Sequence, residues 1–264
     1  MNLTHHTAPS RPSPYGLISG WGKLIHAGAL LFAAALSPST YSPAIRRAVA
    51  NRICRTAAQT IPLFILLAAL FSLVLVHIVV VTAQSYGLSQ FALGMVVRVL
   101  VVELLPLSAA LYVALRTDTG AASEDNALPG ALGLPVDTLA ARLEAARLLI
   151  LPRVLADTLT VVALIAFGGT LAMLLAYVGV YGVTPWGVAA FTRTVGQVFD
   201  PVVTLSLALK TLFFAVAVAT IPALASAASA RGGGGRDAVL RQRPPRLFMV
   251  LIAIEMLALT AEFY

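Results

Sequence analysis

The sequence predicts an all-α integral membrane protein with an N-terminal interfacial helix, five transmembrane helices and a short cytoplasmic helix after the second span. Composition is the first observation: 59% of the residues are hydrophobic, 11% are charged and the mean hydropathy is +0.90. Soluble domains average about 45–50% apolar and about 25% charged residues. The second observation is that several apolar runs reach the roughly 18 residues needed to span a bilayer as a helix. These runs occupy most of the chain, which leaves no room for a large soluble domain.

The N-terminal part of the chain is expected to stay outside the membrane core. Residues 1–14 are polar and proline-rich, and they lack the basic and apolar regions of a cleavable signal peptide, so we expect a disordered cytoplasmic tail. Residues 15–60 are expected to form an interfacial, amphipathic helical region, which we favour over a further span because Tyr15 and Trp21 mark its start. Its basic residues are Arg46, Arg47, Arg52 and Arg55.

Residues 61–264 are predicted to hold the five spans. The first is "IPLFILLAALFSLVLVHIVVVTA" and the turn "QSYGLSQ" follows it. The predicted spans cover residues 61–83, 91–115, 148–177, 202–226 and 247–261. Two longer loops, 116–147 and 227–246, separate them, and the first of these carries the short helical pattern "DTLAARLEAARLL". Trp186, between spans three and four, is expected to anchor at the membrane interface.

Basic residues predict the orientation. Six Arg and Lys residues precede span one, and both longer loops are rich in arginine, whereas the opposite side carries only Arg193. Cytoplasmic loops are enriched in Lys and Arg, so the N-terminus and both loops are expected in the cytoplasm and the C-terminus outside. The net charge of +7 therefore indicates membrane topology rather than nucleic-acid binding. The single cysteine, Cys54, excludes an internal disulfide and a multi-cysteine metal site.

Several charged residues fall inside the predicted spans. An isolated charge at mid-bilayer costs roughly 2.5–3.5 kcal/mol, so such residues usually face a partner or a wet cavity. The candidates for a polar path or pocket between helices are His77, Arg98, Glu103, Lys210 and Glu255. The alternative is purely structural: Glu103 and Lys210, or another pair, hold the bundle together. Pro106 removes a backbone hydrogen bond and is expected to kink span two.

Motifs for catalysis are missing from the sequence. It contains no GxxxxGK[ST] phosphate loop, no HExxH and no GxSxG, and "RGGGGR" has no following Lys-Ser/Thr. The acidic and basic residues are too few and too scattered to support an enzyme. We therefore expect a non-enzymatic chain that binds no cofactor and hydrolyses no ATP by the phosphate-loop route.

Five local patterns resemble the MlaE/YrbE-like permease family. "LGMVVRVLVVELLP" is similar to the family's "rElgP" segment through Glu103 and Pro106, and "LILPRVLAD" is similar to its "PRvlA" segment through Arg153. "LALKTLFFAVAVA" is similar to its "lKs..Fg" stretch through Lys210. Arg116 and Glu124 fall at the Arg of "aGRvG" and the Glu of "aaElG", although the surrounding cytoplasmic motifs diverge.

The resemblance implies the permease subunit of an ABC transporter in the bacterial inner membrane. Such a subunit moves phospholipid or a related lipid to or from the cell envelope, together with a separate ATPase that binds ATP, an MCE-domain protein and a second permease copy. The resemblance also implies that the intramembrane candidates lie in the wall of the lipid pocket. The residues expected to couple to the ATPase are Arg116, Glu124, Asp137, Arg142, Glu144, Arg147 and Arg153.

Two other functions stay open at this point. One is an ATPase-independent transporter in which Glu103, Glu255 and His77 are proton-linked groups. Five spans without an inverted repeat argue against it. The other is a membrane scaffold that transports nothing, which the divergent cytoplasmic motifs favour.

Overall fold

The structure is a computed structural model that describes residues 43–88, 91–124, 151–229 and 243–263. These residues form helices joined by short turns, without any strand, so the all-α prediction is confirmed. The predicted tail 1–14, the first part of the interfacial region and most of both longer loops lie outside the described residues. The helices are α2 (Pro43–Ser85), α3 (Ala92–Val96), η3 (Val97–Leu104), α4 (Leu105–Glu124), α6 (Leu151–Tyr181), η5 (Pro185–Gly187), α7 (Val188–Val198), α8 (Pro201–Ser229) and α10 (Arg243–Phe263).

Four stretches within these helices are long and apolar enough to cross a membrane. They are Val49–Ser85, Ala92–Arg116, Pro152–Tyr181 and Pro201–Pro222. The apolar part of α10, Leu247–Thr260, is shorter. At about 1.5 Å per residue, the whole of α10 is about 31 Å long, close to the roughly 30 Å of hydrocarbon in a bilayer. Four of the predicted spans thus have the length of a membrane helix, and the fifth stays a prediction.

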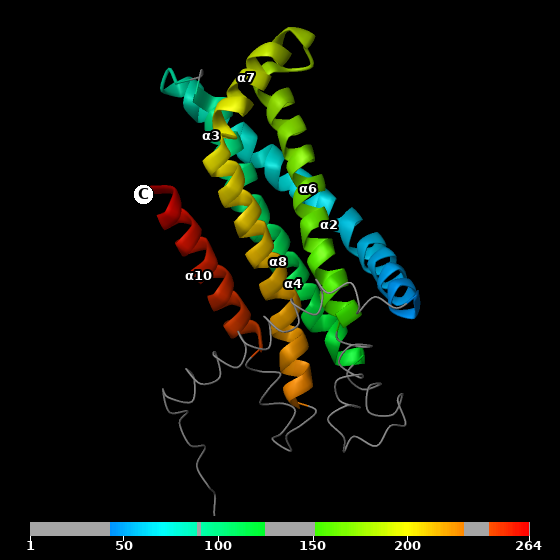
Figure 1. The fold of residues 1–264 in the computed structure, drawn as a ribbon. Coiled ribbons are helices and arrows are strands. Elements are labelled where there is room, and N and C mark those ends of the chain that lie inside the picture. Colours follow the sequence, from blue (N-terminus) through cyan, green and yellow to red (C-terminus); the bar gives the residue numbers. More distant parts are fainter. Residues whose placement is uncertain (1–42, 89–90, 125–150, 230–242, 264) are drawn as a thin grey trace, which may run out of the picture.

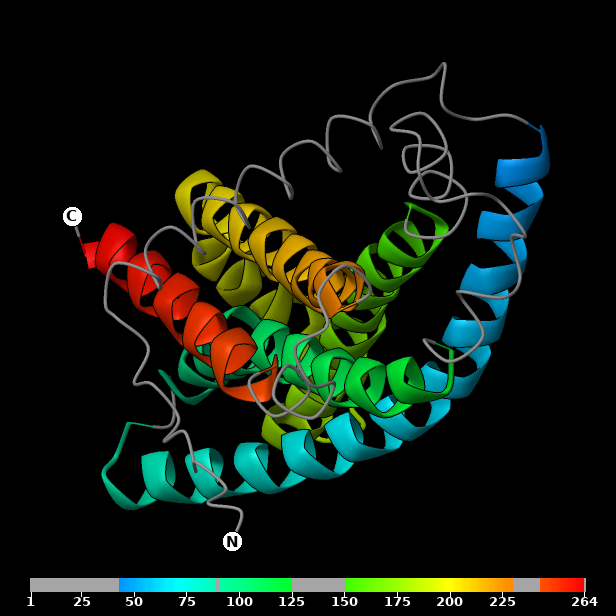
Figure 2. The same cartoon turned by 90° about the horizontal axis from the view of Figure 1, so that it is seen from below.

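Helix α2 joins two regions that the sequence analysis treated separately. It runs without a break from the basic residues Arg47 and Arg55 through Pro62 to Ser85. At about 1.5 Å per residue, its 43 residues extend for about 65 Å. Figure 2 shows that this helix curves around one side of the bundle. The described part of the predicted interfacial region is therefore continuous with the first span.

The helices alternate in direction along the bundle. In Figure 1, the α2–α3 turn and the α6–α7–α8 connection lie at the top, whereas α4 and α8 end, and α6 and α10 begin, towards the bottom. Helix α2 packs on α6, α6 on α8, and α8 on α10. Helix α4 contacts α6, α8 and α10 and lies at the centre of the bundle (Figure 2). This central position brings the second span into contact with the last two helices.

Close packing of apolar side chains fixes the bundle. Phe64 of α2 is 2% exposed and its ring centroid lies 5.4 Å from that of Tyr112 of α4. Gly168 of α6 leaves room for both neighbours, because a Cβ atom there would lie 3.1 Å from Phe64 and 3.1 Å from Leu105. Many other leucines and valines point outward, as expected where lipid tails cover the surface. The side chain of Trp186, next to α7, is 90% exposed.

Candidate intramembrane polar site

A π-helical segment carries Glu103. Segment η3 spans Val97–Leu104 inside the second membrane helix and ends two residues before Pro106. Pro106 has no N–H group to donate to the carbonyl four residues earlier, so regular α-helical bonding cannot continue back through this turn. π-Helical turns are rare and often occur at functional sites. Glu103 therefore projects from an irregular turn in the middle of a mainly apolar helix.

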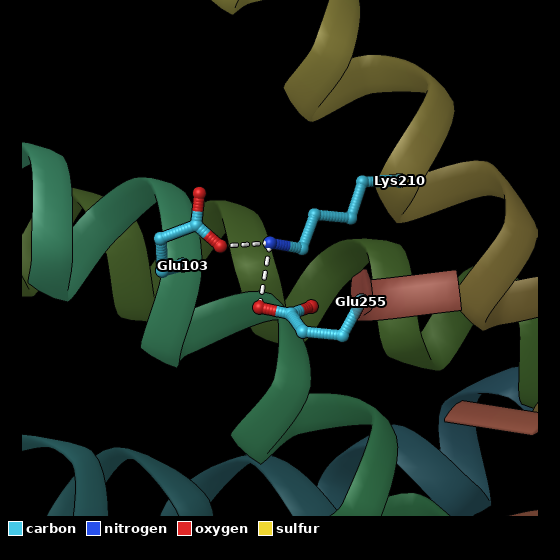
Figure 3. A network of polar contacts seen from close by, with 3 residues as sticks. All are labelled: Glu103, Lys210 and Glu255. Atoms are coloured by element: carbon cyan, nitrogen blue, oxygen red, sulfur yellow. Dashed lines mark hydrogen bonds and ion pairs between the residues drawn. The ribbon is translucent and has the colours of Figure 1, made fainter. Parts of the chain in front are cut away.

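Three charged residues from different helices meet beside this segment. The Lys210 ammonium of α8 donates a hydrogen bond to Glu255 Oε1 of α10 at 2.8 Å and a second one to Glu103 Oε2. Both contacts are also ion pairs. Figure 3 shows the two carboxylates converging on the same nitrogen atom. We refer to Lys210, Glu103 and Glu255 as the charged triad.

The triad is enclosed on the lysine side and more open on the carboxylate side. The Lys210 side chain is 1% exposed, whereas those of Glu103 and Glu255 are 18% and 15% exposed. Glu255 Oε2 is buried and has no hydrogen-bond partner among the described residues. Removing one partner of a buried ion pair strongly destabilises a protein. The triad therefore stabilises the packing of η3, α8 and α10 against one another. Its partly exposed carboxylates also form a polar surface inside an apolar bundle.

The other two predicted intramembrane residues lie apart from the triad. His77 of α2 and Arg98 of η3 both have exposed side chains. Neither is a partner of the ion pairs that hold Lys210. The structure thus brings together three of the five predicted residues and places two on the outer surface of the bundle.

Two of the residues predicted to couple to an ATPase form contacts within the chain. The Arg116 guanidinium at the end of the second span donates to the Gln59 carbonyl at 2.6 Å and to Gln59 Oε1 at 3.1 Å. This links α4 to α2 three residues before Pro62. Arg153 is buried near the start of α6, four residues before the buried Asp157.

Of the remaining coupling candidates, the structure describes only Glu124. Glu124 is the last residue of α4. Asp137, Arg142, Glu144 and Arg147 lie outside the described residues.

Sequence reasoning missed two residues near the coupling candidates. Gln59 was not singled out, because the carbonyl that loses its helical donor at Pro62 is that of Ala58, and no local pattern marks Gln59 as a partner of Arg116. The burial of Asp157, four residues after the buried Arg153, was also not expected. Within the described part of the chain, no group of three His, Cys, Asp or Glu side chains could hold a metal ion.

Comparison with known proteins identifies a family. Residues 49–254 match a family model described as "Permease MlaE". The match covers most of the chain, includes Glu103 and Lys210, and ends one residue before Glu255. No curated protein and no solved structure matches the chain.

Proposed function

The chain belongs to the MlaE permease family, and from this membership we propose that it is the membrane subunit of an ABC transporter that moves phospholipid or a related lipid. We propose that it works in the bacterial inner membrane, with its N-terminus in the cytoplasm. Helix α4 ends, and α6 and α10 begin, at the same end of the bundle (Figure 1), and the sequence carries arginine at or near each of these helix ends, which supports this orientation.

The observation that carries the proposal is the charged triad at membrane depth. Each of its residues lies roughly 12–17 Å along its apolar helix from the first residue of that stretch, at about 1.5 Å per residue. Ionisable groups at such depth usually mark a substrate or ion pathway. The partly exposed carboxylates of Glu103 and Glu255 give a polar lipid head group a place to contact the permease during its passage. Lys210 holds both carboxylates in position.

The energy for transport is proposed to come from a separate subunit. The chain has no phosphate-loop motif, so ATP would bind to a partner ATPase. We propose that this ATPase contacts the cytoplasmic end of the bundle through the 116–147 connection. An MCE-domain protein on the opposite side and a second copy of the permease complete the proposed complex.

Lipid movement in a reconstituted system tests the role of the triad. The permease, its ATPase and a fluorescent phospholipid are combined in liposomes, and the ATP-dependent rate is compared for wild type and Glu103→Ala. We expect a strong loss of transport with normal yield of folded protein. Asp200→Asn is the matched control, because Asp200 is an exposed carboxylate that caps α8 through the Val203 N–H and lies outside the triad.

Each other outcome has a defined meaning. If Glu103→Ala transports at the wild-type rate, the triad is not part of the lipid path. If the variant is lost during purification, the triad acts in stability alone. Transport that proceeds equally without ATP would support an ATPase-independent transporter instead.

A second experiment tests the proposed contact with the ATPase. Deleting residues 137–147 is expected to abolish co-purification of the ATPase while the helical content of the permease is retained. If the ATPase still co-purifies, the coupling surface lies elsewhere on the chain.

A further inference from the structure

The charged triad has an unequal number of positive and negative groups. Lys210 supplies one positive charge, and both of its ion-pair partners are carboxylates. With all three groups ionised, the site would carry a net charge of −1. The three groups come from three different helices and meet within the apolar part of the bundle. A bilayer interior strongly disfavours an unbalanced charge.

No other cation of the described residues contacts the two carboxylates. Arg98 precedes Glu103 by five residues on η3, but its side chain is exposed and forms no ion pair with it. The apolar part of α8 contains no charged residue besides Lys210. Other charged or titratable groups on the neighbouring helices are Arg46, Arg47, Arg52, Cys54, Arg55 and His77 on α2, Tyr112, Arg116, Asp118 and Glu124 on α4, Arg153, Asp157, Tyr177 and Tyr181 on α6, Arg193 on α7, Arg243 and Arg246 at the start of α10, and Glu262 near its end.

The geometry of the two carboxyl groups indicates how the excess negative charge is neutralised. Both contact the same nitrogen atom, so they lie close to each other (Figure 3). Two carboxylates that share a site do not both ionise readily. Glu255 Oε2 is buried without a hydrogen-bond partner among the described residues, a situation that an ionised oxygen tolerates poorly.

We propose that the triad binds one proton at neutral pH, held by the Glu103–Glu255 pair and mainly on Glu255, so that the intramembrane site is electrically neutral. The proton adds to a carboxylate and forms a carboxylic acid, while Lys210 remains the cation for the other carboxylate. This inference depends on the membrane location of the triad and not on the lipid cargo. It makes the site a place where a proton is taken up or released when the contacts of Lys210 change.

Infrared spectroscopy of the full-length chain in lipid nanodiscs tests the proposal. A protonated carboxyl group has a carbonyl stretch distinct from that of a carboxylate, and this band shifts in heavy water. Wild type is compared at neutral pH with Glu103→Gln and Glu255→Gln. In each variant the remaining glutamate pairs with Lys210 alone, so the site is neutral without a proton. We therefore expect both single variants to lose one carboxylic-acid band relative to wild type.

The two variants together discriminate between explanations. A wild-type spectrum that matches both variants in the carboxylic-acid region would overturn the proposal. This is the spectrum expected if a metal cation, rather than a proton, balanced the charge. A band that survives in Glu103→Gln would show that Glu255 is protonated independently of its neighbour, which also contradicts the shared site. Asp200→Asn, a carboxyl-to-amide change at an exposed position, should leave the band unchanged.

The design tolerates the failure of one variant and separates the two proposals. If one variant does not fold, the other still decides the result, because the same loss is expected for both. The measurement contains no ATPase and no transport step. Absence of the band would refute proton binding and leave lipid transport standing, whereas a chain that moves no lipid could still show the band.

Discussion

Replacing Lys210 by methionine removes the cation that joins Glu103 to Glu255. The side chain of Lys210 is 1% exposed, and methionine has a similar length, so the substitution changes the charge more than the packing. Both carboxylates then remain in the bundle without a cation among the described residues. We expect this single change to destabilise the fold more than the loss of either glutamate.

The magnitude follows from the contacts that are lost. Lys210 makes two hydrogen bonds to carboxylates, and a hydrogen bond to a charged group contributes about 1.5–3 kcal/mol. Losing both predicts a decrease of about 3–6 kcal/mol, which agrees with about 3–5 kcal/mol for breaking a buried ion pair. Glu103→Gln and Glu255→Gln each leave Lys210 with one carboxylate, so a much smaller decrease is expected.

The free energy of unfolding is measured by reversible denaturation in mixed detergent micelles, with helical circular dichroism as the signal. The variant Lys210→Met/Glu103→Gln/Glu255→Gln is the matched control, because it removes all three ionisable groups together. It should recover most of the loss, and the loss in Lys210→Met should be larger at alkaline than at acid pH, since protons neutralise the unpaired carboxylates. A Lys210→Met protein as stable as wild type at alkaline pH would refute the reasoning.

Two further predictions concern the contacts between helices. Arg116→Ala should lower the free energy of unfolding by about 1–2 kcal/mol, because the hydrogen bonds from the half-buried guanidinium to Gln59 are lost. Arg116→Lys should recover little of this stability, since lysine lacks the planar guanidinium. Full recovery in Arg116→Lys would contradict the assigned geometry. Gly168→Ala should cost about 1–3 kcal/mol through overpacking against Phe64. Gly196→Ala, where nothing lies within 4 Å of the added Cβ atom, should be neutral or stabilising in the same denaturation assay.

Helix positions could be predicted from the sequence because the apolar runs are long. The second and fourth spans were expected at 91–115 and 202–226, and the structure has membrane-length stretches at Ala92–Arg116 and Pro201–Pro222. The short helix α7 was treated as a connection, because its eleven residues are too few to give a clear apolar run. The continuity of α2 through Pro62 was also not expected, since proline usually interrupts a helix.

The face on which a charged residue lies was harder to predict. Lipid and protein core are both apolar, so the hydrophobic pattern of a membrane helix does not tell the inward face from the outward one. From the sequence, Arg98 and Glu103 were therefore equally good candidates for the intramembrane site. In the structure Arg98 is exposed, whereas Glu103 pairs with Lys210. The π-helical turns of η3 also change which residues share a face, because their periodicity differs from that of an α-helix.

The pairing of Glu103 with Lys210 was foreseen as one structural possibility, because opposite charges at similar depth stabilise each other. The participation of Glu255 depended on where α10 packs. That contact joins residues 45 positions apart in the chain, and no local pattern encodes it. The charge imbalance of the site could be recognised only after all three residues were seen together.

The most direct test of the proposed function is purification of the tagged full-length chain from its native membrane in mild detergent, followed by mass spectrometry of the proteins and lipids that accompany it. We predict that an ATP-hydrolysing subunit, an MCE-domain protein and bound phospholipid accompany the permease. A folded permease that carries neither an ATPase nor lipid would contradict the proposed function.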